Sequence, residues 1–180
     1  HTGIRRQRQM CIRDRYHARG IAATIELADK LNFTKNSNII DIGCGLGGPA
    51  RYFSKRFNCN VYGIDITEAF IEIGTYFNKL TKIDHQVKLL KGDGENLPYQ
   101  TEFFDGAVSQ HVTMNIEDRE QFFNEAFRVL KKGAIFGFSE HGLGTKGSPI
   151  FPLTWADNAN MIFLKTPEYT KSLLKKIGPQ

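Results

Sequence analysis

The chain has few cysteines and no long hydrophobic run. Its 180 residues include three cysteines, whose positions match neither a zinc-binding nor a Cys-x-x-Cys spacing. An odd number of cysteines without secretory features is typical of reduced thiols in a cytoplasmic protein, and we expect no metal site. No apolar run approaches the roughly 20 residues that span a bilayer, and no signal-peptide pattern opens the chain. We therefore expect a cytoplasmic protein without a membrane partner.

Outside residues 1–15, the chain also has almost no excess of positive over negative charge. The chain has 24 basic and 19 acidic residues, and residues 1–15 contain five of the former and one of the latter. Removing them leaves 19 basic and 18 acidic residues for 16–180. This nearly neutral body predicts no nucleic-acid partner, because such partners require a basic surface.

Residues 1–15 differ from the rest of the chain. Residues 10–15 read Met-Cys-Ile-Arg-Asp-Arg, which resembles the translated end of a sequencing adapter. We expect 1–15 to be a non-native segment and 16–180 to be the domain. The alternative is a basic, disordered arm that contacts an anionic partner.

After residue 15, apolar spacing predicts an alternation of helices and strands. The expected helices cover residues 21–32, 48–57, 68–81, 118–130 and 167–177. The expected strands cover residues 38–43, 60–66, 87–92, 104–112 and 133–140. Such alternation is typical of an α/β domain with a doubly wound parallel sheet covered by helices on both faces.

The first strand ends in an acid and a glycine-rich turn. Gly43, Gly45 and Gly47 follow Asp41 at alternate positions, so the backbone can adopt positive φ and a ligand can approach the main chain. A loop that binds pyrophosphate presents N–H groups to an anion, which the Asp41 carboxylate would repel. Asp41 therefore favours a ligand with positive charge.

A second acid ends the next strand. Asp65 lies 18 residues after Gly47, at the place where doubly wound nucleotide-binding folds hold ribose hydroxyls. Together with Asp41 and the glycine turn, it resembles the cofactor site of the class I S-adenosylmethionine-dependent methyltransferases.

This resemblance implies a Rossmann-like sheet in the order 3-2-1-4-5, extended by a final antiparallel strand pair. The chain stops after the helix that should lead into that pair, so we expect a C-terminal truncation. The family also implies that an acid after the third strand, here Asp93, binds the adenine amino group. The residues expected to bind S-adenosylmethionine are Asp41, Gly43, Gly45, Gly47, Asp65, Ile66, Asp93, Gly94, Ser109 and Gln110.

Three short patches resemble a subgroup of small-molecule enzymes related to sarcosine/dimethylglycine N-methyltransferases. They are Gly-Leu-Gly-Gly-Pro-Ala-Arg at 45–51, His-Val-x-Met-Asn-Ile at 111–116 and Pro-x-x-Trp-Ala at 152–156. The resemblance implies methyl transfer by in-line displacement to a small acceptor, with amines and amino acids as candidates.

Three residues at the ends of the fourth and fifth strands are candidates for the chemistry. An ammonium acceptor must lose a proton, and a histidine suits that step. We predict His111 as the base, with Gln110 and Glu140 orienting substrate or cofactor. Met114 and Trp155 are candidates for an apolar wall, where Trp155 could also pack against an alkylated ammonium.

Two other functions stay open at this point. One is an oxidoreductase that binds NAD in the same fold, and the other is a non-catalytic subunit that keeps the cofactor loop. Base methylation is disfavoured, because no Asn/Asp-Pro-Pro-aromatic run and no Pro-Cys pair occurs in the sequence. The sequence specifies neither the acceptor atom nor the oligomeric state.

Overall fold

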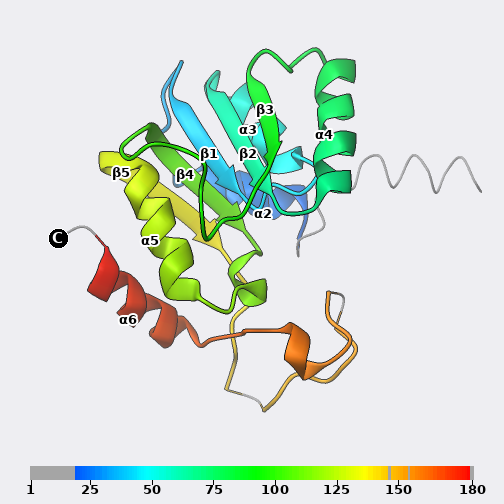
Figure 1. The fold of residues 1–180 in the computed structure, drawn as a ribbon, viewed down its shortest axis with the longest axis vertical. Coiled ribbons are helices and arrows are strands. Elements are labelled where there is room, and N and C mark those ends of the chain that lie inside the picture. The colour runs from blue at the N-terminus through cyan, green and yellow to red at the C-terminus, as the bar shows by residue number, and fades with distance from the viewer. Residues whose placement is uncertain (1–18, 146, 154, 179–180) are drawn as a thin grey trace, which may run out of the picture.

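The fold is seen in a computed structural model that describes residues 19–145, 147–153 and 155–178. The predictions for residues 1–15 concern residues outside this part. Five parallel strands form one sheet in the order β3-β2-β1-β4-β5 (Figure 1), which confirms the predicted topology. The strands are β1 (Asn38–Ile42), β2 (Asn60–Asp65), β3 (Val87–Lys91), β4 (Phe104–Gln110) and β5 (Leu130–Ser139).

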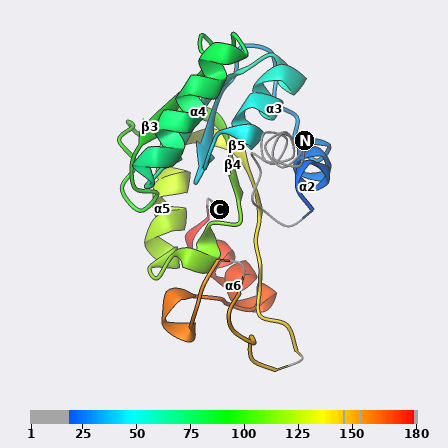
Figure 2. The ribbon, with the colours of Figure 1, turned by 90° about the vertical axis from the view of Figure 1, so that its right-hand side faces the viewer.

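Helices cover both faces of the sheet (Figure 2). One face carries α2 (Ile21–Ala28), α3 (Gly48–Phe57) and α4 (Glu68–Leu80), and the other carries α5 (Arg119–Val129) and α6 (Pro167–Ile177). Two short 3-10 helices, η1 (Thr113–Asn115) and η2 (Ala159–Met161), lie in the connections after β4 and β5. Within the described residues, no helix is both long and apolar enough to cross a bilayer.

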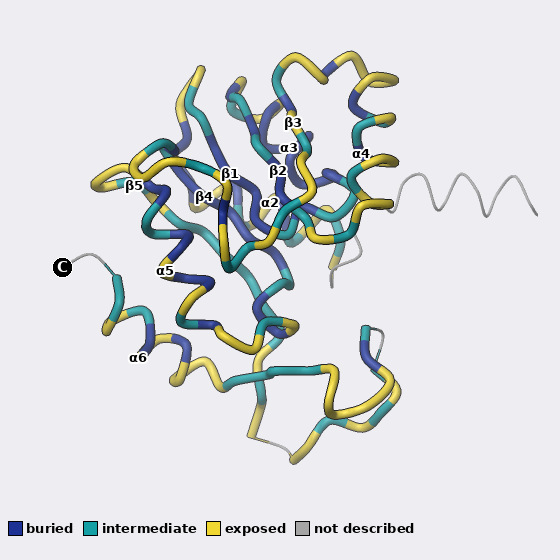
Figure 3. Tube along the Cα trace, in the orientation of Figure 1, coloured by how far each residue is buried: buried dark blue, intermediate teal, exposed yellow. Residues whose placement is uncertain are grey.

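The central strand β1 is buried on both sides, as its dark blue trace shows (Figure 3). Two adjacent residues of this strand, Ile39 and Ile40, are both 0% exposed and point to opposite faces of the sheet. Ile39 packs in the cluster with Phe53 of α3, and Ile40 packs in the cluster with Phe122 of α5. A continuous apolar strand of this kind is typical of a parallel sheet between two helical layers.

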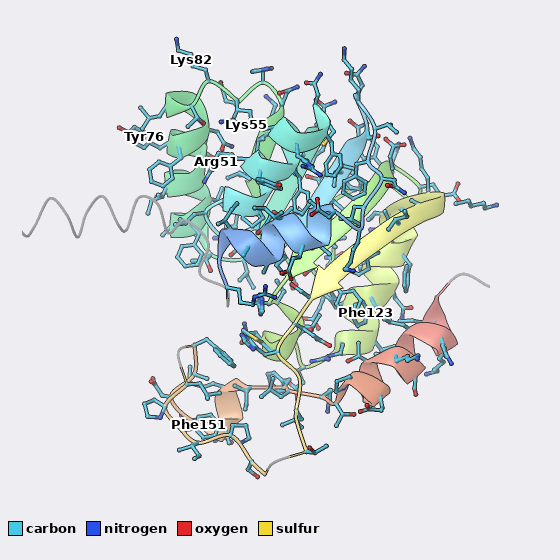
Figure 4. All side chains as sticks on the ribbon, turned by 180° about the vertical axis from the view of Figure 1, so that it is seen from behind. Arg51, Lys55, Tyr76, Lys82, Phe123 and Phe151 are labelled. Atoms are coloured by element: carbon cyan, nitrogen blue, oxygen red, sulfur yellow. The ribbon has the colours of Figure 1, made fainter. Side chains whose placement is uncertain are left out.

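Helix α5 follows its predicted amphipathic pattern. Phe122 and Phe123 are fully buried against the sheet, and Figure 4 shows Phe123 on the face opposite α2 and α3. Asp118 accepts a hydrogen bond from the Gln121 N–H at 2.9 Å and caps the helix. The helix therefore holds the segment that follows β4 firmly against the sheet.

Two predicted boundaries differ from the structure by three residues or more. The first helix ends at Ala28 rather than residue 32, because a turn there directs Leu31 and the following chain into the core. The fifth strand starts at Leu130 rather than Gly133. Gly133 has a φ of +75° inside the strand, and the pairing with β4 shifts register at this point. The strand continues through a bulge that the sequence presents as a turn.

Candidate active site

A large pocket opens at the carboxyl ends of the central strands, where doubly wound sheets bind ligands. Its volume is about 1020 Å³. Eight of the ten residues predicted to bind the cofactor line it. They are Asp41, Gly43, Gly45, Asp65, Ile66, Asp93, Gly94 and Gln110, together with the predicted base His111. Gly47, Ser109 and Glu140 do not line it.

The glycine turn needs its glycines for two different reasons. Gly43 has a φ of +78°, and a Cβ placed on it would lie 2.1 Å from Cγ2 of Val112. Gly45 has a φ of +54° with open space beside it, so the backbone here is bare toward the pocket. Gly47, with a φ of +75°, caps α3 and turns the chain into the helix. Gly47 thus shapes the turn from outside the pocket.

Asp65 fastens the end of β2 to this turn. Its Oδ2 accepts the Gly45 N–H at 2.8 Å, and its Oδ1 accepts the Thr67 N–H at 2.9 Å. Both bonds fix the carboxylate at the pocket wall, beside the exposed side chain of Ile66. A carboxylate held in this way keeps further lone pairs for a ligand hydroxyl.

The carboxylate of Asp41 is buried, and one of its oxygens lacks a hydrogen-bond partner among the described residues. Asp41 is 1% exposed, and this oxygen is Oδ2. Burial, followed by the nearby Asp65 carboxylate, raises the pKa of Asp41 from 3.8 to about 7. An unpaired buried carboxylate in a pocket wall is costly unless a donor or a cation meets it.

The segment after β3 brings two more acids to the pocket. Asp93 Oδ1 accepts the Glu95 N–H at 2.9 Å in a tight turn. Partial burial, then the charges of Asp93 and Asp118, raise the pKa of Glu95. A Cβ on Gly94 would lie 2.9 Å from the Phe122 ring. The turn therefore packs on α5 while its polar atoms face the pocket.

The end of β4 contributes an unpaired donor. Ser109 lies below the pocket, where its hydroxyl donates to the Ile42 carbonyl at 2.8 Å. The Gln110 Oε1 accepts the Thr24 hydroxyl at 3.1 Å, whereas its Nε2 has no partner among the described residues. Gln110 is 7% exposed and lines the pocket, so this buried amide N–H is a candidate donor to a ligand.

Three flat side chains continue the wall from β4 to the segment before η2. The rings of His111 and His141 lie 4.5 Å apart, and Trp155 stacks on His141 at 4.7 Å with an interplanar angle of 10°. The Trp155 Nε1 is buried and has no partner among the described residues. Met114 also lines the pocket.

Glu140 belongs to a different arrangement. Its carboxylate accepts hydrogen bonds from Arg119 at 3.1 Å, from the Thr170 hydroxyl at 3.0 Å and from the Thr113 hydroxyl. Arg119 is 2% exposed and also donates to the carbonyls of Thr113 and Phe163. The Glu140 side chain therefore ties η1, β5 and α6 together behind the pocket wall, and it faces a smaller cavity of about 410 Å³.

Sequence reasoning missed Arg119 and Thr24. Arg119 is the first residue of α5 after its cap, a place where a solvent-exposed charge is the ordinary expectation. Its buried partners are 21 and 51 residues away in the chain, and no sequence pattern links them. No cluster of His, Cys, Asp or Glu suited to a metal occurs among the described residues.

Comparisons with known proteins identify the family of the chain. Residues 40–138 match a family model described as a methyltransferase domain. A sarcosine/dimethylglycine N-methyltransferase from Halorhodospira halochloris is 30% identical over 146 residues, which are 79% of this chain and 51% of that enzyme. A sterol 24-C-methyltransferase from Candida albicans is 32% identical over 114 residues, which are 63% of this chain and 30% of that enzyme. The chain thus spans about a third to a half of these relatives.

Solved structures share the fold. Phosphoethanolamine N-methyltransferase 2 from Haemonchus contortus, in complex with S-adenosyl-L-methionine, superposes with a TM-score of 0.81 at 21% identity, covering 92% of this chain and 38% of that one. The [4+2]-cyclase SpnF superposes with a TM-score of 0.77 at 23% identity, covering 87% of this chain and 57% of that one. The family match covers more than half of the chain and includes the strands that build the pocket. This chain belongs to the methyltransferase domain family.

Proposed function

We propose that the chain binds S-adenosylmethionine in this pocket and transfers its methyl group to a small-molecule acceptor. The relatives named above support the proposal, since their names specify sarcosine, dimethylglycine and sterols as acceptors. A structural neighbour, geranyl diphosphate C-methyltransferase from Streptomyces coelicolor, was solved with S-adenosyl-L-homocysteine. Fold alone is a weak guide to chemistry, so the residues of the pocket must carry the argument.

The observation that carries it is the unpaired Asp41 carboxylate. A buried Oδ2 without a partner among the described residues suits a ligand that brings N–H donors or positive charge. S-adenosylmethionine has both, in its ammonium and its sulfonium. A dinucleotide would instead bring a pyrophosphate close to Asp41 and Asp65, where two carboxylates oppose it.

Other residues proposed to bind the cofactor lie at the ends of β2 and β3, and each group contacts a different part of it. Asp65, fixed by the N–H groups of Gly45 and Thr67, is placed to accept hydrogen bonds from ribose hydroxyls. Ile66 offers an exposed apolar side chain for one face of the adenine ring. Asp93 and Gly94 line the same end of the pocket, and Asp93 is our proposed partner of the adenine amino group.

The methyl group arrives already activated on a sulfonium, so the protein mainly aligns the acceptor. Proximity and orientation supply roughly 7–11 kcal/mol in well-aligned systems. Gln110 and His111, at the end of β4, line the pocket beside Met114. We assign His111 to take the proton from an amine or amino-acid acceptor and Gln110 to orient acceptor or cofactor. Glu140, engaged by Arg119, holds the wall from behind.

Isothermal titration calorimetry of the 180-residue chain with S-adenosylhomocysteine and, separately, NAD tests the cofactor. We expect micromolar binding of S-adenosylhomocysteine and none of NAD. Asp65→Ala should weaken binding by ten- to a hundredfold, because hydrogen bonds to a charged group contribute about 1.5–3 kcal/mol. Asp29→Ala, which removes an exposed ion pair with Arg56 outside the pocket, is the matched control. Preferential binding of NAD would select the oxidoreductase instead.

Transfer itself is tested with S-adenosylmethionine labelled in the methyl group. Label should pass to at least one amine, amino acid or hydroxyl compound of a small acceptor panel. The rate should fall at least a hundredfold in His111→Ala, since general-base catalysis contributes about 10²–10⁴. Tight S-adenosylhomocysteine binding without transfer to any acceptor would favour the non-catalytic subunit.

A further inference from the structure

We infer that the methyl acceptor carries a carboxylate, and that this group binds at the β4–β5 end of the pocket against the indole N–H of Trp155. The inference rests on the proposed function, because it assigns the other end of the pocket to the cofactor. It chooses among the amine and amino-acid candidates in favour of acceptors with an acidic group.

The polar groups of the pocket are divided between its two ends. All the acidic residues that line it lie at the ends of β1 and β2 or just after β3. They are Asp41, Asp65, Asp93 and Glu95. The residues that line it at and after β4 and β5 are neutral side chains or imidazoles, such as Gln110, His141 and Trp155. An ammonium acceptor would find no carboxylate partner among the described residues at this end.

Two side chains at this end have donors and no partner for them. The Trp155 Nε1 and the Gln110 Nε2 are both buried and unpaired within the described part of the chain. An indole N–H can only donate a hydrogen bond. A buried donor without a partner destabilises the protein, so a ligand oxygen that meets it gains that interaction.

The position of Trp155 is fixed by its neighbour. Its ring stacks on His141, which in turn contacts the His111 ring. Since Trp155 stacks through its face, its N–H points along the ring edge and is free of the stacking contact. The row of rings forms a wall that leads from the proposed base His111 to the indole N–H of Trp155.

The charge of the bound cofactor favours the same class of acceptor. The sulfonium is a cation next to the reacting atom, and it attracts a carboxylate and repels an ammonium. Attraction to the sulfonium and a hydrogen bond from the wall act together on a carboxylate. An amino acid with a neutral amine then presents its nitrogen to the methyl group while its carboxylate binds at the wall.

The test compares acids with their primary amides on the chain saturated with S-adenosylhomocysteine. Two pairs are used: N,N-dimethylglycine with its amide, and 4-hydroxybenzoate with 4-hydroxybenzamide. Trp155 is the single tryptophan of the sequence, so its fluorescence reports binding at this wall. Calorimetry gives the affinities in Trp155→Phe, which keeps an aromatic ring and removes the N–H. Tyr76→Phe, on the exposed face of α4, is the matched control.

We expect one acid to bind at least tenfold more tightly than its amide, and to change the Trp155 emission. In Trp155→Phe this preference should shrink about tenfold while the affinity for S-adenosylhomocysteine stays within twofold. Equal binding of acids and amides, no binding of either acid, or a preference that survives Trp155→Phe would overturn the inference. Failure of S-adenosylhomocysteine to bind would instead contradict the proposed function itself.

Discussion

Asp41→Asn should stabilise the ligand-free protein at pH 8 and weaken cofactor binding at the same time. The substitution keeps the shape of the side chain and removes the buried negative charge. Asp41 is 1% exposed with an unpaired Oδ2, so its charge costs folding free energy that only a ligand offsets. A residue kept for binding at the expense of stability has this signature.

The magnitude follows from the two pKa values of Asp41. The unfolded chain loses the proton near pH 3.8, whereas the folded protein retains it to about pH 7. Between these values the folded state binds more protons, so the contribution of Asp41 to stability is present below pH 3.8 and is lost as pH rises to about 7. The loss corresponds to about 4 kcal/mol at pH 8.

Urea unfolding of wild type and Asp41→Asn at pH 4.5 and pH 8 measures this difference. We expect the variant to be more stable by about 1 kcal/mol at pH 4.5, where the unfolded chain has already lost most of the Asp41 proton, and by several kcal/mol at pH 8. Asp105→Asn is the control of opposite sign. Partial burial raises the pKa of Asp105, but hydrogen bonds from Lys131 and from the Asn38 N–H lower it overall, so Asp105→Asn should not stabilise at pH 8.

A variant no more stable than wild type at pH 8 would refute this reasoning, because the Asp41 carboxylate would then be compensated in the free protein. In calorimetry, the variant should bind S-adenosylhomocysteine at least tenfold more weakly at pH 8. A stabilised variant with unchanged affinity would show that the charge is buried but does not contact the ligand.

Three further substitutions test particular contacts. Arg119→Met should destabilise the protein by about 3–5 kcal/mol, because it leaves the Glu140 carboxylate without its charged partner. Urea unfolding checks this against Lys91→Met, which removes an exposed ion pair with Glu68, and equal effects of the two substitutions would contradict it. Gly43→Ala should lower stability and abolish S-adenosylhomocysteine binding, since the new Cβ would lie 2.1 Å from Val112; calorimetry and thermal unfolding measure both, and normal binding would refute the close approach. Thr166→Ala should cost about 1 kcal/mol by removing the cap of α6, and restoration of that loss by Thr166→Ser would separate capping from packing.

Much of the fold could be predicted because its signals are local. The strand that leads into Asp41, the glycine turn and the caps at Asp118 and Thr166 are each encoded within a few residues. Alternation of strands and helices then leaves few topologies for a parallel sheet. The start of β5 was misplaced at Gly133 because a glycine after two lysines is ordinarily a turn signal.

The site was predicted where it lies on strand ends and missed where it depends on long-range contacts. Asp41 and Asp65 lie at the ends of β1 and β2, and Asp93 comes two residues after β3, so the topology alone brings them together. The role of Glu140 depends on Arg119, which the fold brings to it from 21 residues away. The burial of Arg119 depends on contacts from several helices and strands, and the spacing of residues along the sequence does not predict such contacts.

The most direct test of the central claim is a crystal structure of the 180-residue chain with S-adenosylhomocysteine bound. We expect ribose hydroxyls on Asp65, adenine beside Ile66 and Asp93, and the sulfur directed toward Gln110 and His111. A ligand bound elsewhere, or one with its adenine at the Trp155 end of the pocket, would show that this pocket end does not bind the cofactor as proposed.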